Sequence, residues 1–132
     1  MLTRVPPRLP PEVEAVVFQI IGAAIEVHRH LGPGFLESIY QRAICIELDE
    51  RGTSFEKKKR IAILYKGRIL QGQELDLVVE SKVVVEVKAV SQLEEIHASQ
   101  LVSYLKTTGL RAGLLINFNV PVLKAGIRRI VL

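Results

Sequence analysis

The stretch Val83-Val84-Val85-Glu86-Val87-Lys88-Ala89-Val90 decides the fold and raises the question of function. Five of its eight residues are valine, so it is predicted to be a buried strand. Glu86 and Lys88 interrupt it two residues apart, which places both side chains on one face of that strand. Charged side chains are rarely buried unless they are paired or bind a metal, so this face needs a chemical explanation.

The segments on either side of this strand predict helices first and then a sheet. Apolar residues recur at helical spacing over 13–31 and 36–48, and Gly32-Pro33-Gly34 separates the two runs. A third helix is expected over 93–106. From Phe55 the pattern changes to strands, which are expected over 61–65, 75–79, 83–88, 112–118 and 127–132.

This order of elements, α-α-β-β-β-α-β-β, predicts an α/β fold with a mixed central sheet flanked by helices. The short turn Glu80-Ser81-Lys82 predicts an antiparallel hairpin, and the helix between strands 83–88 and 112–118 makes those two strands parallel neighbours. Residues 12–132 are expected to form a single domain. Residues 1–11 are rich in proline and are expected to form an extended arm.

Composition narrows the class of protein. The 132 residues are 48% hydrophobic and 24% charged, which is typical of a globular domain. A single cysteine, Cys45, excludes an internal disulfide framework and a cysteine-based zinc cluster, and it is expected to be a small core residue. No signal peptide and no apolar run of membrane-spanning length is visible, so we expect a cytoplasmic protein with no membrane partner.

A third charged residue, Asp76, lies in the apolar strand that precedes the Glu86 strand. Facing side chains on neighbouring strands approach within about 5 Å, and two carboxylates at that distance repel unless a cation lies between them. Mg²⁺ or Mn²⁺ with oxygen ligands resolves this, and Lys88 would then orient an attacking water or stabilise an anionic transition state. The alternative is a buried ion pair of Lys88 with one of the carboxylates.

The pattern Asp76…Glu86-Val87-Lys88, set in α-β-β-β-α-β order, resembles the PD-(D/E)XK nuclease superfamily, whose core is restriction-endonuclease-like. Residues 34–40, Gly-Phe-Leu-Glu-Ser-Ile-Tyr, resemble the motif that names the GxxExxY family within that superfamily. Residues 100–105 and the LLINF run at 114–118 are also similar to that family. One departure is that Gln73-Glu74-Leu75, before Asp76, lacks the proline of the superfamily pattern.

The resemblance implies a Mg²⁺- or Mn²⁺-dependent nuclease, with DNA favoured over RNA. It implies that Asp76, Glu86, Glu37 and the Val87 carbonyl hold the metal and that Lys88 is the catalytic lysine. Gln100 matches a glutamine that often supports the site in the superfamily. The second class of function left open is a nuclease-like module without activity, kept for binding nucleic acid or for protein assembly.

Several of these residues have plainer interpretations. Glu37 is also what a helix dipole favours in a first turn. Tyr40 is expected to be a packing residue whose hydroxyl bonds within the site. Gln100 and Tyr104 share a helix face and either support the site or cap the edge of the core. His97 contacts a phosphate or water, or is a partly exposed structural histidine.

Basic residues give the chain a net charge of +4, which permits a polyanionic partner. We expect the backbone phosphates of nucleic acid to be bound by a set of exposed basic side chains, against the alternative that they form only a solvated face. The set is Lys57, Lys58, Lys59, Arg60, Arg68 and Lys106, with Arg128 and Arg129. A chain of this size leaves little room for a DNA-clasping subdomain, so a homodimer is expected.

Overall fold

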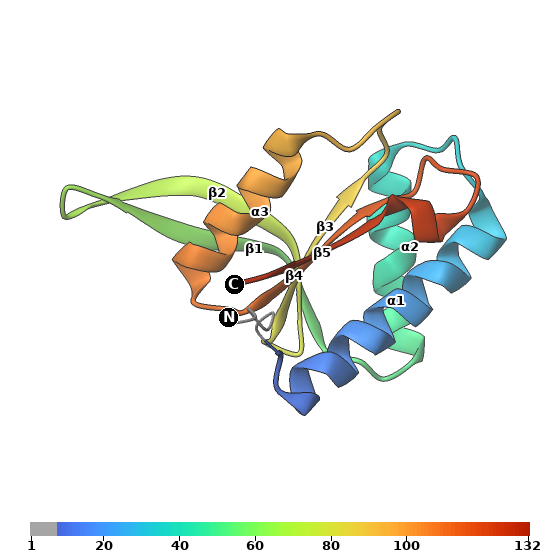
Figure 1. Cartoon of the computed structure of the whole chain (residues 1–132), viewed down its shortest axis with the longest axis horizontal. Coiled ribbons are helices and arrows are strands. Elements are labelled where there is room, and N and C mark those ends of the chain that lie inside the picture. The colour runs from blue at the N-terminus through green and yellow to red at the C-terminus, as the bar shows by residue number, and fades with distance from the viewer. Residues whose placement is uncertain (1–7) are drawn as a thin grey trace, which may run out of the picture.

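The structure is a computed structural model that describes residues 8–132. Three helices and five strands follow the predicted order (Figure 1). In chain order they are α1 (Pro11–Leu31), α2 (Glu37–Glu50), β1 (Phe55–Tyr65), β2 (Arg68–Val79), β3 (Val83–Lys88), α3 (Glu95–Thr108), β4 (Ala112–Asn117) and β5 (Ile127–Val131). The predicted restriction-endonuclease-like α/β fold is confirmed.

The five strands form one mixed sheet in the order β1-β2-β3-β4-β5. Only the central pair, β3 with β4, is parallel, and α3 makes the crossover between them. The other three pairs are antiparallel, including the predicted hairpin of β2 with β3. Strand β3, which carries Glu86 and Lys88, is thus the central strand of the sheet.

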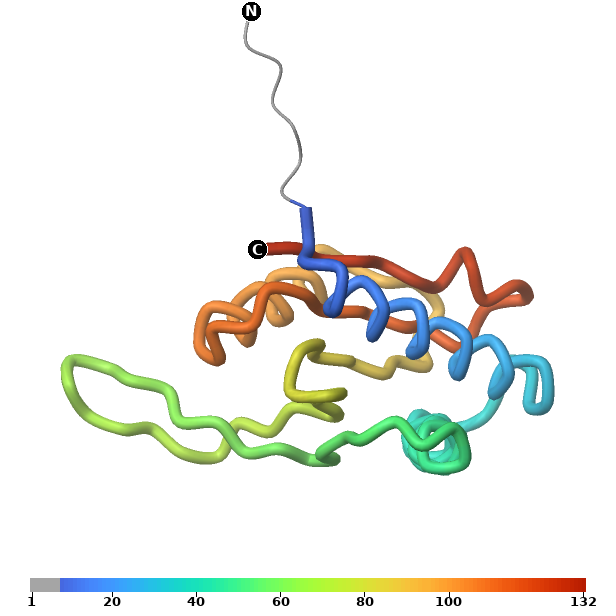
Figure 2. Tube along the Cα trace, turned by 90° about the horizontal axis from the view of Figure 1, so that it is seen from below, coloured from blue at the N-terminus to red at the C-terminus, as the bar shows by residue number. Residues whose placement is uncertain are grey.

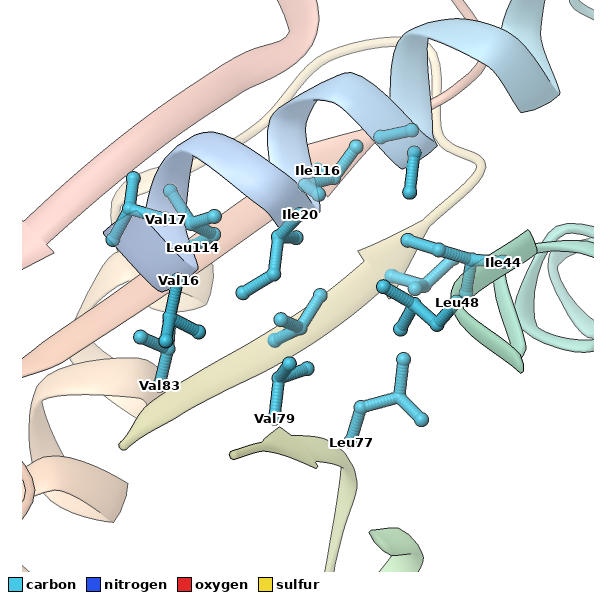
Figure 3. Close-up of a cluster of buried hydrophobic side chains, with 14 of the residues drawn as sticks. Val16, Val17, Ile20, Ile44, Leu48, Leu77, Val79, Val83, Leu114 and Ile116 are labelled. Carbon is cyan, nitrogen blue, oxygen red and sulfur yellow. The ribbon is translucent and has the colours of Figure 1, made fainter. Parts of the chain in front are cut away.

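Two apolar cores cover the two faces of this sheet. The larger core packs α1 and α2 on one face, and Figure 3 shows Ile20 of α1 and Ile44 of α2 directed toward the strands. The smaller core packs Leu101 and Leu105 of α3 on the other face. Along β3 the valines alternate between the cores, with Val83, Val85 and Val87 in the larger one and Val84 in the smaller one. By this alternation Glu86 and Lys88 lie on the face that α3 covers.

The first hairpin is longer than the sequence predicts. Strand β2 begins at Arg68 instead of at residue 75, and together with β1 it runs out past the rest of the sheet (Figures 1 and 2). Residues 68–73 are largely exposed and include Gly72, so they carry no alternation of apolar and polar residues from which to predict a strand. The short 3-10 helix Leu123–Gly126 is also absent from the sequence prediction.

At the N-terminus, α1 begins at Pro11, one residue before the predicted domain start. Proline suits the first turn of a helix because its missing N–H would have no helical partner there. Of the predicted extended arm, residues 1–7 lie outside the described residues. Within residues 8–132, no helix combines the length and apolar character needed to cross a bilayer.

Candidate active site

The candidate site forms where β2 changes face. Leu77 packs in the core under α1 and α2, whereas Leu75, two residues earlier, packs in the core under α3. Side chains two apart on a regular strand share a face, so the strand is irregular at the residue between them, Asp76. The β2–β3 ladder also ends here. Its pair nearest to Asp76 is Leu77 with Val85, and the next residues along, Asp76 and Glu86, are not paired in the ladder. The two strands therefore separate at Asp76 and Glu86.

Side chains bond to backbone groups at the point where this ladder stops. The Val87 N–H donates to Asp76 Oδ2 at 2.8 Å, and the Asp76 N–H donates to Glu86 Oε1 at 3.2 Å. Each carboxylate thus satisfies an amide on the other strand. Buried amides need such partners, and these bonds hold both carboxylates at the place where the strands part.

Burial and repulsion raise the proton affinity of Glu86. Its side chain lies in the sheet with 8% of the residue exposed. Burial, and next the charge of Asp76, raise the pKa of Glu86 from 4.5 to about 8, although Lys88 acts in the opposite direction. The site therefore has too little positive charge to hold both carboxylates ionised at neutral pH.

Lys88 lies two residues after Glu86 on the same face of β3 and is partly exposed. Within residues 8–132, none of the ion pairs joins Lys88 to Asp76 or Glu86. The geometry therefore does not show the buried ion pair that the sequence left open as an alternative. The Lys88 amine is available for another anion.

Tyr104 of α3 lies close enough to both carboxylates for their charges to affect its pKa. Burial, and then the charges of Glu86 and Asp76, raise the pKa of the Tyr104 phenol. Its hydroxyl accepts a 3.0 Å hydrogen bond from Gln73 Nε2. Tyr104 thus lies beside the carboxylate pair, and Gln73 of β2 donates a hydrogen bond to its hydroxyl; a supporting role for Tyr104 stays a prediction.

The other predicted helix residues are less closely tied to the carboxylates. Glu37 is partly buried in the first turn of α2, and no cluster of three or more Asp, Glu, His or Cys able to hold a metal occurs within residues 8–132. Gln100 is exposed on α3. His97 Nδ1 accepts the Glu94 N–H at 3.0 Å as part of a capping box, which matches its structural interpretation.

Tyr40 is a packing residue. It is fully buried and stacks on Phe118 with ring centroids 4.7 Å apart. Its hydroxyl donates to the Gly32 carbonyl at 2.6 Å and accepts the Phe35 N–H at 3.1 Å. Tyr40 therefore closes the loop that leads into α2, and the hydroxyl does not bond to Asp76 or Glu86.

The predicted basic residues fall into two groups. Lys59 pairs with Glu56 at 3.0 Å and Arg60 pairs with Glu74 at 3.6 Å, so their charges are partly neutralised. Arg129 pairs with Glu14. Among the described residues no ion pair involves the other members of the set, namely Lys57, Lys58, Arg68, Lys106 and Arg128.

A groove of about 750 Å³ runs beside the site, and we call it the α2–β1 groove. One face of α2 between residues 38 and 49 forms one wall, and the other is formed by residues 74–77 of β2 with Phe55, Lys57 and Lys58 of β1. Arg42, Lys57 and Lys58 bring positive charge to it, and Asp76 belongs both to the groove and to the carboxylate pair.

Sequence reasoning gave no role to Gln73, Arg42 or Asn117. Asn117 is 2% exposed, and its amide ties β4 to the segment after Lys88 by accepting the Val90 N–H at 3.0 Å and donating to the Val90 carbonyl at 2.9 Å. A polar residue that ends a fully apolar strand was the available signal. Gln73 and Arg42 carried no signal, because their neighbours are brought to them only by the fold.

The carboxylate pair fits a divalent cation. Asp76 and Glu86 supply hard oxygen donors, which Mg²⁺ and Mn²⁺ prefer. Burial first, and then the charge of Asp76, raise the pKa of Glu86, and a bound cation would offset the charge of Asp76. The Val87 amide binds Asp76, so Val87 is part of the site through its backbone, and the role of its carbonyl as a ligand stays a prediction.

The chain was compared with known proteins. A family model described as the PD-(D/E)XK nuclease superfamily matches residues 14–130. No curated protein and no solved structure matches the chain.

Proposed function

We propose that this chain, which belongs to the PD-(D/E)XK nuclease superfamily, is a metal-dependent phosphodiesterase that cleaves nucleic acid, with DNA favoured over RNA. The observation that carries the proposal is the pair of hydrogen bonds that join β2 and β3 where the strands separate, one from the Val87 N–H to the Asp76 carboxylate and one from the Asp76 N–H to the Glu86 carboxylate. It holds two carboxylates together at the edge of a groove lined by basic residues.

In this proposal Asp76 and Glu86 hold Mg²⁺ or Mn²⁺. Such an ion lowers the pKa of a bound water and offsets the charge of a scissile phosphate. Glu37 and the Val87 carbonyl are further candidate ligands from the family resemblance. A bound cation also favours the ionised form of Glu86, whose proton would otherwise weaken the site.

Lys88 is proposed as the catalytic lysine. Because it projects from the same face of β3 as Glu86 and forms no ion pair among residues 8–132, its ammonium is available to stabilise the developing negative charge on the phosphate. Tyr104 and Gln100, from α3, are proposed to support substrate or Lys88 from the same side of the sheet. Lys57, Lys58, Arg68 and Lys106 would bind backbone phosphates.

Two finer assignments are also proposals. Membership of the GxxExxY family rests on Gly34, Glu37 and Tyr40 at the spacing of that motif. A homodimer is favoured by the small size of the chain and by exposed apolar side chains near the end of the β1–β2 hairpin.

A nuclease assay tests the proposal. The full chain is incubated with supercoiled, linear, single-stranded and branched DNA and with RNA, in Mg²⁺, in Mn²⁺ and in EDTA. We expect cleavage that EDTA abolishes and that falls by at least about 100-fold in Lys88→Ala, because a single group stabilising transition-state charge contributes that much. Lys124→Ala, which removes an exposed lysine outside the site, is the matched control and should cleave at the wild-type rate.

Metal-independent cleavage, or equal activity in Lys88→Ala and wild type, would contradict the assignment. A folded protein that cleaves nothing and binds no Mn²⁺ by calorimetry would favour the module without activity.

A further inference from the structure

Lys58 has a backbone conformation that its position in the chain does not explain. Four non-glycine residues within residues 8–132 have a positive φ. Three of them, Lys66, Glu80 and Ser81, lie in the tight turns of the two hairpins, where such conformations are common. Lys58, at φ +51°, lies inside strand β1. A side chain with a β-carbon is strained in this region, so the rest of the structure must hold Lys58 there.

Lys58 on β1 lies opposite Asp76 on β2, the residue at which β2 is irregular. In the β1–β2 ladder, Lys57 pairs with Leu77 and Lys59 pairs with Leu75. Lys58 and Asp76 lie between these two pairs, so both strands depart from regular geometry at the same level of the sheet. The carboxylate that the site needs and the strained lysine are therefore placed by one local distortion.

The distortion changes which lysines reach the α2–β1 groove. In a regular strand Lys57 and Lys58 would point to opposite faces of the sheet. Both nevertheless line the groove, together with Arg42 from α2. Lys59 and Arg60, the next two residues, do not contribute in the same way because each is paired with a glutamate.

The contents of the groove match a phosphodiester chain. Arg42, Lys57 and Lys58 form no ion pair among the described residues, which leaves their charges for an anion. Phe55 and Ile46 add apolar surface of the kind that sugars contact. The acidic residues of the groove are Asp49, Glu74, which pairs with Arg60, and Asp76 of the site itself.

We propose that the α2–β1 groove holds the phosphate backbone of the strand to be cleaved, and that the left-handed conformation of Lys58 places its amine on that backbone. This inference rests on the proposed nuclease function and adds to it the path by which substrate reaches Asp76. It also divides the basic run 57–60, so that Lys57 and Lys58 bind substrate and Lys59 and Arg60 do not.

The chain contains a matched control for Lys58. Lys66 is also a lysine with positive φ, at +50°, but it is exposed in the β1–β2 turn, outside the residues of the groove. Lys58→Gly and Lys66→Gly each remove one positive charge and relieve the same backbone strain, because glycine adopts this region freely. Neither variant should unfold at a lower temperature than the wild type, which is checked by thermal denaturation.

Binding is measured on the full chain in EDTA, so that no strand is cut. We titrate three fluorescein-labelled probes of one sequence at several salt concentrations, namely single-stranded DNA, duplex DNA and RNA. Comparing their affinities identifies which type of nucleic acid the groove binds. We expect Lys58→Gly to bind the preferred probe about tenfold more weakly, with a salt slope smaller by about one. Lys66→Gly should bind like the wild type, and Lys58→Arg should keep most of the affinity.

Three outcomes would overturn the inference. One is a Lys58→Gly variant that binds as tightly as the wild type, and another is an equal loss of affinity in Lys66→Gly, which would show only general charge attraction. In either case cleavage by the wild type would leave the nuclease function standing. A wild-type chain that neither binds nor cleaves any probe would overturn both proposals.

Discussion

The protonation of Glu86 links the free energy of unfolding to pH. Its pKa of about 8 lies well above the 4.5 of an unperturbed glutamate, first because it is buried and second because Asp76 carries a like charge nearby. Without a cation, the folded protein therefore keeps a proton on Glu86 at neutral pH, whereas the unfolded chain does not.

This difference predicts how stability depends on pH in the absence of metal. Below pH 4.5 Glu86 is protonated in both states, and between pH 4.5 and 8 only the folded state keeps the proton. The free energy of unfolding should therefore fall as pH rises through this window, by on the order of 5 kcal/mol from this residue. Urea unfolding in EDTA at several pH values measures it.

In Glu86→Gln this part of the pH dependence should disappear, and the variant should be more stable than the wild type at pH 8. Glu95→Gln removes an exposed carboxylate of α3 and is the control, with a pH profile like that of the wild type. Parallel profiles for wild type and Glu86→Gln would contradict the assignment of a raised pKa to Glu86.

Single residues show where sequence reasoning succeeds and where it stops. Asp76, Glu86 and Lys88 are singled out because charges are rare in apolar strands, and in the structure the two carboxylates each accept a hydrogen bond from a backbone amide of the opposite strand. The left-handed Lys58 cannot be found this way, because a lysine in a basic run carries no sign of its φ angle. The Gln73–Tyr104 bond joins residues 31 apart, and only the fold reveals it.

Among the elements, the end of β3 depends on β4 for its position. Beyond Lys88 the chain leaves the sheet, and the buried Asn117 side chain holds Val90 by two hydrogen bonds. The Phe118 N–H adds a third link by donating to the Lys88 carbonyl at 3.0 Å. The end of the strand that carries Lys88 is thus held at the Lys88 carbonyl and at Val90, two residues beyond it.

Replacing Asn117 with alanine should release this segment. We expect Asn117→Ala to lower the free energy of unfolding by about 2 kcal/mol, because the partly buried backbone N–H and C=O of Val90 lose their bonds to the Asn117 amide. If Lys88 is the catalytic lysine as proposed, the substitution should also lower kcat more than it raises KM, because Lys88 is displaced while the groove is unchanged. Chemical denaturation and steady-state nuclease kinetics measure the two effects.

Asn119→Ala is the control for Asn117→Ala, since the Asn119 side chain makes one longer bond to the Val90 carbonyl at 3.4 Å. Its effects should be well under half as large. Equal effects of the two substitutions would show that Asn117 does not hold the segment by its own bonds.

The order and type of the elements could be predicted from the sequence because hydrophobic periodicity reports burial. The predictions are weakest where burial is low. The exposed first half of β2 and the 3-10 helix Leu123–Gly126 carry no periodic pattern, and both are absent from the sequence prediction. The groove could not be predicted at all, since it depends on how α2 sits against β1 and β2.

At the scale of the whole molecule, the end of the β1–β2 hairpin is an unusual surface. Ile63, Leu64, Tyr65, Ile69 and Leu70 are all exposed there, between 36% and 71%. Leu64 pairs with Ile69 and Ile63 with Leu70, so adjacent pairs present apolar side chains on both faces of the ribbon. Two-stranded ribbons are marginally stable by themselves, and large exposed apolar patches mark interaction sites.

We therefore predict that two copies of the chain associate through this hairpin end. Sedimentation velocity should show a dimer for the wild type, and a Leu64→Ser/Ile69→Ser double variant should sediment as a monomer with unchanged circular dichroism. Ile46→Ser, which removes an exposed apolar side chain of α2, is the control and should remain dimeric. A wild type that stays monomeric at every concentration would exclude a homodimer.

The two hydrogen bonds that the Asp76 and Glu86 carboxylates accept from backbone amides also affect how such a protein can change over evolutionary time. Each carboxylate satisfies an amide of the opposite strand, so truncating either side chain removes a proposed metal ligand and also leaves a backbone N–H without its acceptor. Substitution by asparagine or glutamine keeps an oxygen for that amide and removes only the charge. In a related protein that has lost catalysis but kept the fold, asparagine at position 76 or glutamine at position 86 is therefore expected to be the first substitution.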